Sequence, residues 1–149
     1  MLDLQTVEHP WPQLAADTLA GGFLQDAQNE FVRFRKLMRP KMLENWWTDV
    51  VAEAMQQFYA DLLAGKRPNL AIGAPPQHGK SWAATDFVGW VAGKNPDLKI
   101  IFASYSDDLG MRTNLDLQRM FELPQYQKTF PDTRIGDAPP GDTAVRLVM

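Results

Sequence analysis

The spacing of apolar residues predicts three helices in the middle of the chain. Between Leu43 and Ala64 apolar residues recur every three to four positions, which places them on one broad stripe of a helix. Gly65 follows at the position where glycine commonly ends a helix. The same period over residues 81–92 and 108–122 predicts two further helices, the second capped by Ser106 or Asp107.

Two short apolar runs between these helices predict strands. Residues 69–73 (NLAIG) and 99–104 (KIIFAS) are apolar, the second rich in β-branched and aromatic residues, and both are bounded by turn-forming residues. The order strand, helix, strand, helix favours an α/β fold with a parallel sheet and flanking helices. After Pro124 the pattern weakens: residues 126–130 predict a short helix, and residues 144–149 (AVRLVM) predict a strand that has only begun.

The N-terminal part is divided by charge. Residues 1–30 contain no Lys or Arg and predict one weak helix, interrupted by Gly21 and Gly22. Residues 31–42 contain no acid, and their basic residues alternate with aromatic ones, so they either contact a DNA backbone or a partner subunit, or form a solvated amphipathic segment paired with the acidic arm. We favour the second interpretation because the two charges balance. The candidate contact residues are Arg33, Arg35, Lys36 and Arg39. We expect an arm over residues 1–42 and a domain over residues 43–149.

Residues 69–82 (NLAIGAPPQHGKSW) predict a phosphate-binding loop between a strand and a helix. The backbone amides of such a loop point at a phosphate, and the helix N-terminus adds its positive dipole end. Lys80 would reach the phosphates, and the Ser81 hydroxyl would ligate Mg²⁺. In the pattern G-x-x-x-x-G-K-[ST], Ala74 stands where the first glycine belongs. The predicted nucleotide-binding residues are Ala74, Pro75, Pro76, Gln77, His78, Gly79, Lys80 and Ser81.

Side chains near the loop leave two questions open. The prolines lack N–H donors and stiffen the loop, so the amides come from residues 77–81. His78 either senses a γ-phosphate or faces solvent, and we favour solvent. An aromatic residue near the start of the helix over residues 43–64 either packs in the core, which we favour, or stacks on an adenine.

Composition narrows the class of protein. The chain has 149 residues, enough for one domain with a sizeable core. Its net charge of −3 gives no general sign of nucleic-acid binding. It has no cysteine, no signal-peptide pattern and no apolar run near the length of about 20 residues that spans a membrane. We therefore expect a soluble, cytoplasmic protein.

Three segments resemble the large terminase subunit of tailed bacteriophages, in its N-terminal packaging ATPase domain. They are AGKRPNLAIGAPPQHGKS, GKNPDLKIIFASYSDDLGMRTN and LPQYQKTFPD, within residues 46–132. The resemblance implies an ASCE-type P-loop ATPase fold with ATP and Mg²⁺ as ligands. It also implies a ring of subunits at the portal of a procapsid in the host-cell cytoplasm, with double-stranded viral DNA and a small terminase subunit as partners and no membrane.

The sequence departs from that family at two places. Many members have an arginine where this chain has Gln77, and a substitute would come from the basic residues between Arg33 and Arg39, or from Arg112 or Arg119. The acidic strand that positions the attacking water is not recognisable: Asp107 and Asp108 fall past the second predicted strand, in a helix cap, and no acid follows residue 144. The sequence thus predicts ATP binding and leaves ATPase activity open. The alternatives are a nucleotide-binding or interaction module without catalysis, another P-loop enzyme, or a truncated remnant.

Overall fold

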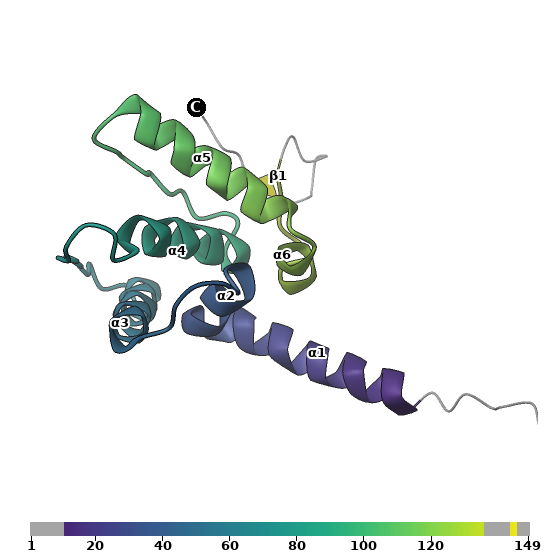
Figure 1. The fold of residues 1–149 in the computed structure, drawn as a ribbon. Coiled ribbons are helices and arrows are strands. Elements are labelled where there is room, and N and C mark those ends of the chain that lie inside the picture. The colour runs from purple at the N-terminus through teal and green to yellow at the C-terminus, as the bar shows by residue number, and fades with distance from the viewer. Residues whose placement is uncertain (1–10, 136–143, 146–149) are drawn as a thin grey trace, which may run out of the picture.

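Helices make up most of the described chain (Figure 1). The computed structural model describes residues 11–135 and 144–145, with side-chain positions over residues 20–133. Two short strands, β1 (Arg134–Ile135) and β2 (Ala144–Val145), pair in parallel over two residues each. The helices are α1 (Trp11–Asn29), α2 (Phe31–Met38), α3 (Trp46–Leu63), α4 (Lys80–Lys94), α5 (Asp107–Glu122) and α6 (Pro124–Thr129).

The prediction of an α/β fold built on a parallel sheet is wrong. Residues 69–73 and 99–104 form no strand, and β1 with β2 is the only strand pair in the described residues. A strand is completed by hydrogen bonds from a neighbouring strand, and an apolar composition does not supply that neighbour. The second segment instead runs back along α4 as an extended connection to α5 (Figure 1). The predicted strand over residues 144–149 is found at residues 144–145, and its remainder lies outside the described residues.

The helices predicted from periodicity are confirmed, with ends shifted by a few residues. The Asn45 side chain and the Thr48 backbone and side chain form a capping box at the start of α3. Gly65, with φ of 75°, follows the end of that helix in the left-handed conformation that glycine adopts without strain. Of the two proposed caps of α5, the structure uses Ser106, whose side chain accepts from the Leu109 amide.

The predicted interruption of the first helix is wrong, because α1 continues through Gly21 and Gly22. A glycine inside a helix costs roughly 0.5–1 kcal/mol relative to alanine, which weakens a helix without breaking it. The C-terminal end of α1 is held by packing, since Ala27 is fully buried. In Figure 1 the rest of α1 projects away from the other helices.

Aromatic side chains from α2, α4 and α6 form the centre of the core. Phe31 and Phe34 of α2 are fully buried, and their rings lie 5.5 Å from Trp90 and 6.0 Å from Tyr126, respectively. Tyr126 donates to the Gly89 carbonyl at 2.8 Å, and Trp90 donates to the Ala27 carbonyl at 3.1 Å. The buried polar atoms of both rings are therefore satisfied, as burial of Tyr and Trp requires.

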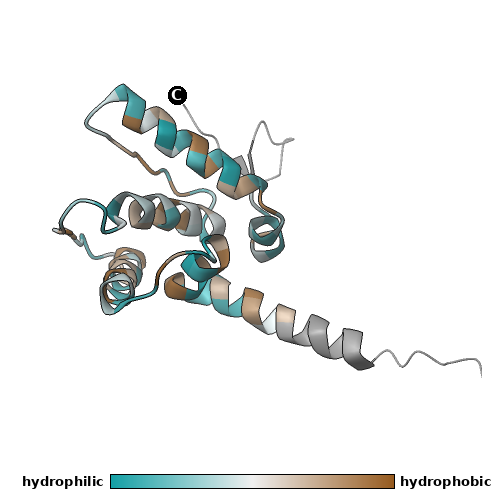
Figure 2. Cartoon of the chain, in the orientation of Figure 1, coloured by the Kyte–Doolittle hydropathy of each residue, from teal (hydrophilic) through white to brown (hydrophobic). Residues whose placement is uncertain are grey.

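The connection between α4 and α5 is less well covered than α4 itself. Apolar residues of the connection between α4 and α5 reach solvent, most of all Ile101 at 95% and Tyr105 at 99% exposure. Figure 2 shows hydrophobic positions along the extended segment, and others on α5. None of the helices in the described ranges has the length and apolar character needed to cross a bilayer.

Candidate phosphate-binding site

Two residues of the loop before α4 have a backbone conformation that occurs in anion-binding turns. Gly79, the N-cap of α4, has φ of 74°, and Gln77 has φ of 66°. Both lie in the left-handed region, which a non-glycine residue rarely adopts and which is enriched at functional sites. Left-handed residues that precede a helix turn successive amides toward one concave side, where a phosphate can bind.

The Lys80 side chain folds back and forms hydrogen bonds with the beginning of this loop. Its ammonium group donates to the carbonyl of Ala74 and, at 3.2 Å, to that of Pro75. The side chain therefore lies across the loop, from the first turn of α4 back to the loop's beginning. The positive charge of Lys80 thus lies beside the carbonyls of Ala74 and Pro75, and its contact with a phosphate stays a prediction.

The N-terminus of α4 is open to a ligand. Gly79 has no side chain with which to cap the first amides of the helix, and the Gly79 carbonyl receives its helical bond from Ala83 at 2.8 Å. Ser81 is exposed one residue into the helix. Its backbone carbonyl accepts from the Thr85 hydroxyl at 2.9 Å. The loop brings Ser81 and Lys80 together at one helix end, where the dipole favours an anion.

Ser81 could supply one oxygen ligand to Mg²⁺. Magnesium in nucleotide sites commonly takes one or two protein oxygens and fills its octahedron with phosphate oxygens and water. A single exposed hydroxyl beside the phosphate loop fits this requirement. Within residues 20–133 no group of three or more His, Asp or Glu side chains is arranged to hold a metal without a phosphate.

The start of α3 contacts the loop. The Trp47 indole nitrogen donates to the His78 carbonyl at 3.2 Å, which ties α3 to the loop. The His78 ring is exposed, and its Nδ1 lies 3.0 Å from the Pro76 carbonyl, so its predicted solvent exposure is confirmed. A cavity of ≈ 450 Å³ lies between the two elements. It is lined by residues 45–47 of the α3 start and by residues 73–75 and 78 of the loop.

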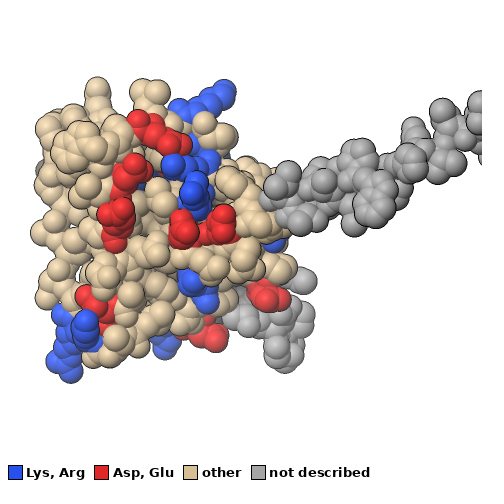
Figure 3. All heavy atoms as spheres, turned by 90° about the horizontal axis from the view of Figure 1, so that it is seen from below, with Lys and Arg blue, Asp and Glu red and all other residues tan. Residues whose placement is uncertain are grey.

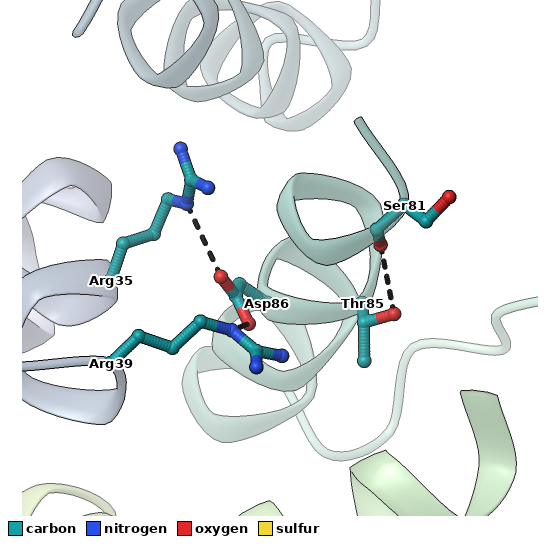
Figure 4. A network of polar contacts seen from close by, with 5 residues as sticks. All are labelled: Arg35, Arg39, Ser81, Thr85 and Asp86. Atoms are coloured by element: carbon teal, nitrogen blue, oxygen red, sulfur yellow. Dashed lines mark hydrogen bonds and ion pairs between the residues drawn. The ribbon is translucent and has the colours of Figure 1, made fainter. Parts of the chain in front are cut away.

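A buried ion-pair network fixes α4 against α2 (Figure 4). Asp86 is fully buried, and its carboxylate oxygens accept from Arg39 Nε at 2.7 Å and from Arg35 Nε at 3.2 Å. Burial raises the pKa of Asp86, and the guanidinium groups of Arg39 and Arg35 oppose that shift. The Arg39 guanidinium also lies 5.0 Å from the centre of the Trp82 ring. These contacts hold the first turns of α4, and with them the loop, in place.

Sequence reasoning missed this network, although a signal was present. Asp86 is the single acid in the helical sequence KSWAATDFVGWVAGK, at a position whose neighbours are mostly apolar. A lone carboxylate within a buried helical face needs a cationic partner. The unusual density of arginine in the segment before α3 offers such partners.

The four basic residues proposed as DNA or partner contacts do not form one surface. The segment is amphipathic, as the favoured interpretation expects, but two of its arginines are not solvated: Arg35 is only 2% exposed, and Arg39 shares its aspartate. Arg33 pairs with Glu30 at 3.5 Å, which is the expected pairing with the acidic arm, and Lys36 pairs with Glu44 at 2.8 Å. On the face seen in Figure 3, acidic and basic side chains are interspersed.

The remaining charged candidates lie on α5. Arg112 is exposed, and Arg119 lies 3.8 Å from Asp116 on the same helix. Asp107 and Asp108 occupy the first turn of α5, where acids stabilise the positive end of the helix dipole. This placement agrees with the expectation that the two acids belong to a helix start.

Comparison of the chain with protein families, with curated proteins and with solved structures finds no match.

Proposed function

We propose that residues 74–81 bind the phosphates of a nucleotide, with ATP and Mg²⁺ as the ligands. The observation that supports this most directly is Lys80, whose ammonium lies inside a loop that carries left-handed residues at positions 77 and 79. The proposal requires only this loop and the first turn of α4. It does not depend on a β-sheet.

The chain's own groups have distinct parts in this binding. The amides at the start of α4 donate to phosphate oxygens, and the dipole of the helix adds to the attraction. Lys80 leaves the loop carbonyls and forms charge-assisted hydrogen bonds with the phosphates. Bound Mg²⁺ would neutralise part of the phosphate charge, with the Ser81 hydroxyl as its protein ligand.

The proposal covers ATP binding and not ATP hydrolysis, because the acids near the loop already have other structural roles. Asp86 is buried between two arginines, and Asp107 and Asp108 lie in the first turn of α5. We also propose, on the resemblance of the three segments alone, that this binding serves a phage terminase in packaging double-stranded DNA through a portal. The small terminase subunit and a ring of like subunits are partners under that proposal.

Calorimetric titration of the full chain with Mg-ATP tests phosphate binding. Lys80→Ala removes the charge inside the loop, and hydrogen bonds to charged groups contribute about 1.5–3 kcal/mol, so we expect the dissociation constant to rise about 10- to 150-fold. Equal affinities for the two proteins would sink the proposal.

Lys99→Ala is the matched control. Lys99 is exposed and follows the opposite end of α4, so the substitution makes the same change in net charge away from the loop. We expect Mg-ATP to bind this variant as it binds the unaltered chain. A loss of affinity equal to that of Lys80→Ala would mean that net charge, and not the loop, governs binding.

A second candidate function is an interaction module, which the exposed apolar connection between α4 and α5 favours. Several large apolar side chains there lie open to solvent, including Ile101 and Tyr105. Large exposed apolar patches commonly mark contacts with other proteins. Sedimentation of the chain with and without Ile101→Lys tests this function: unchanged, purely monomeric behaviour of both proteins would leave self-association without support.

A further inference from the structure

The cavity beside the phosphate loop has walls suited to a planar ring. Two of its lining residues, Trp46 and Trp47, present indole rings whose planes are inclined by 83° with centroids 6.2 Å apart. Pro75 adds an apolar surface from the loop. Its volume of ≈ 450 Å³ falls within the range of about 300–1,000 Å³ that is common for small-molecule sites.

Trp46 lines the cavity, and most of its apolar surface is exposed to solvent. It is 74% exposed, although it begins a helix whose later residues pack in the core. Trp47, by contrast, is partly buried and uses its indole N–H on the His78 carbonyl. The face of Trp46 is therefore open to a ligand, while Trp47 fixes the distance between α3 and the loop.

The cavity and the phosphate site share residues. Ala74 and Pro75 line the cavity, and their carbonyls also accept from the Lys80 ammonium. A ligand in the cavity thus lies directly beside the group that would contact phosphates. A molecule that joins a planar aromatic ring to a chain of phosphates can occupy both places at once.

We propose that this cavity binds the base of the nucleotide, and that Trp46 is the surface on which the base stacks. This inference rests on the proposed phosphate site, because it assigns the other half of the same ligand. Stacking of a base on an aromatic side chain tolerates any base, since each has a π-face. The site is then selective for nucleotides over inorganic polyphosphate, with only modest preference among bases.

Two ligands separate the base from the phosphates in a test. The full chain is titrated with Mg-ATP and with Mg-tripolyphosphate, which carries the phosphates without a base. We expect Trp46→Ala to weaken Mg-ATP about 5- to 150-fold and to leave tripolyphosphate affinity unchanged. Trp46→Phe keeps an aromatic face and is expected to restore most of the ATP affinity. Tyr105→Ala, which removes another exposed aromatic side chain, is expected to change neither affinity.

The outcomes distinguish this inference from the phosphate proposal. If the unaltered chain binds both ligands equally and Trp46→Ala changes neither affinity, the phosphate site stands and the base site is refuted. A parallel loss for both ligands in Trp46→Ala also refutes it, because Trp46 would then act on the loop. If the unaltered chain binds neither ligand, both proposals fail. Because Trp46 is exposed, its truncation is expected to leave the fold intact.

Discussion

The two sides of α4 differ sharply in how they meet the rest of the protein. On one side Asp86 and Trp90 are buried against α1, α2 and α3 by ion pairs, hydrogen bonds and aromatic contacts. Along the other side runs the connection to α5, which exposes Ile101 almost fully. Both regions are rich in apolar residues, so composition alone does not explain the difference.

The difference shows that burial depends on partners from elsewhere in the chain. The buried side receives α2, which supplies two phenylalanines to the core, while Arg35 of α2 and Arg39 at its C-cap bind one aspartate. The exposed side receives an extended segment without strand partners in the described residues. The candidate phosphate loop lies at the N-terminal end of α4, where the hydrogen bond from Trp47 to the His78 carbonyl ties it to α3.

The largest expected effect comes from Asp86→Ala. The substitution leaves the buried Arg35 guanidinium without a counter-charge, and loss of one partner of a buried ion pair costs about 3–5 kcal/mol of the free energy of unfolding. Urea denaturation measures the change. Asp116→Ala, which breaks an exposed pair with Arg119, is the control and is expected to cost about 0–1 kcal/mol. Similar losses of unfolding free energy in both variants would contradict the assigned difference between the buried and the exposed ion pair.

A smaller loss is expected from Gly93→Ala in the packed region. A Cβ atom at this position would lie 2.4 Å from the buried Phe130 ring, and overpacking of this kind costs about 1–3 kcal/mol. Gly22→Ala is the control, because it is also inside a helix but has no atom within 4 Å of the added methyl group. We expect that control to stabilise the protein by about 0.4–1 kcal/mol, so thermal melts should shift in opposite directions.

Tyr126→Phe tests the hydrogen bond between α6 and α4. Its loss leaves the Gly89 carbonyl without the phenol donor and is expected to cost about 1–2 kcal/mol at neutral pH, measured by urea denaturation. Burial also raises the pKa of Tyr126 in the folded state. The unfolded phenol loses its proton near pH 10, so the stability linked to it is complete below that pH and falls as the pH rises further.

The pH dependence separates this phenol from other effects of the substitution. In Tyr126→Phe the alkaline loss of stability is expected to be shallower, though not absent, because burial also raises the pKa of Tyr59. Denaturation curves at pH 8 and above pH 10 measure the slope. An unchanged slope in the variant would show that Tyr126 does not carry the linkage.

The smallest effect is expected from Ile101→Lys on the open side. Ile101 is 95% exposed, so its replacement removes almost no buried surface, and the free energy of unfolding should change by no more than about 0.5 kcal/mol. Urea denaturation at low protein concentration measures it. A loss comparable to that of Gly93→Ala would mean that the connection is packed in solution and would erase the contrast between the two sides.

The parts of the fold that sequence alone predicted are those set by local signals. The 3.6-residue period and the residues Ser106 and Gly65 located α3, α4 and α5, because caps and amphipathic stripes act within one helix. The phosphate loop before Lys80 was predicted from a signal of the same local kind, an adjacent glycine and lysine, and its binding of phosphate stays a prediction.

The parts that failed depend on distant partners. The extended segments 69–73 and 99–104 carry strand-like residues, but no strand lies beside them in the described structure. The pairing of Arg35 with Asp86 joins residues that are 51 positions apart. The same limit applies to Trp47 and His78, whose contact creates the cavity wall but follows from no local spacing.

The hydrogen bonds of Lys80 to its own loop would make the proposed phosphate binding an exchange of hydrogen-bond partners. The ammonium group already has two carbonyl partners, so an arriving phosphate replaces existing bonds and does not meet a bare charge. Net affinity then depends on the difference between anionic and neutral acceptors. The same bonds hold the side chain in the loop before the ligand arrives, so less side-chain entropy remains to be lost on binding. Until a phosphate binds, the loop carbonyls occupy the hydrogen-bond donors that Lys80 would offer to it.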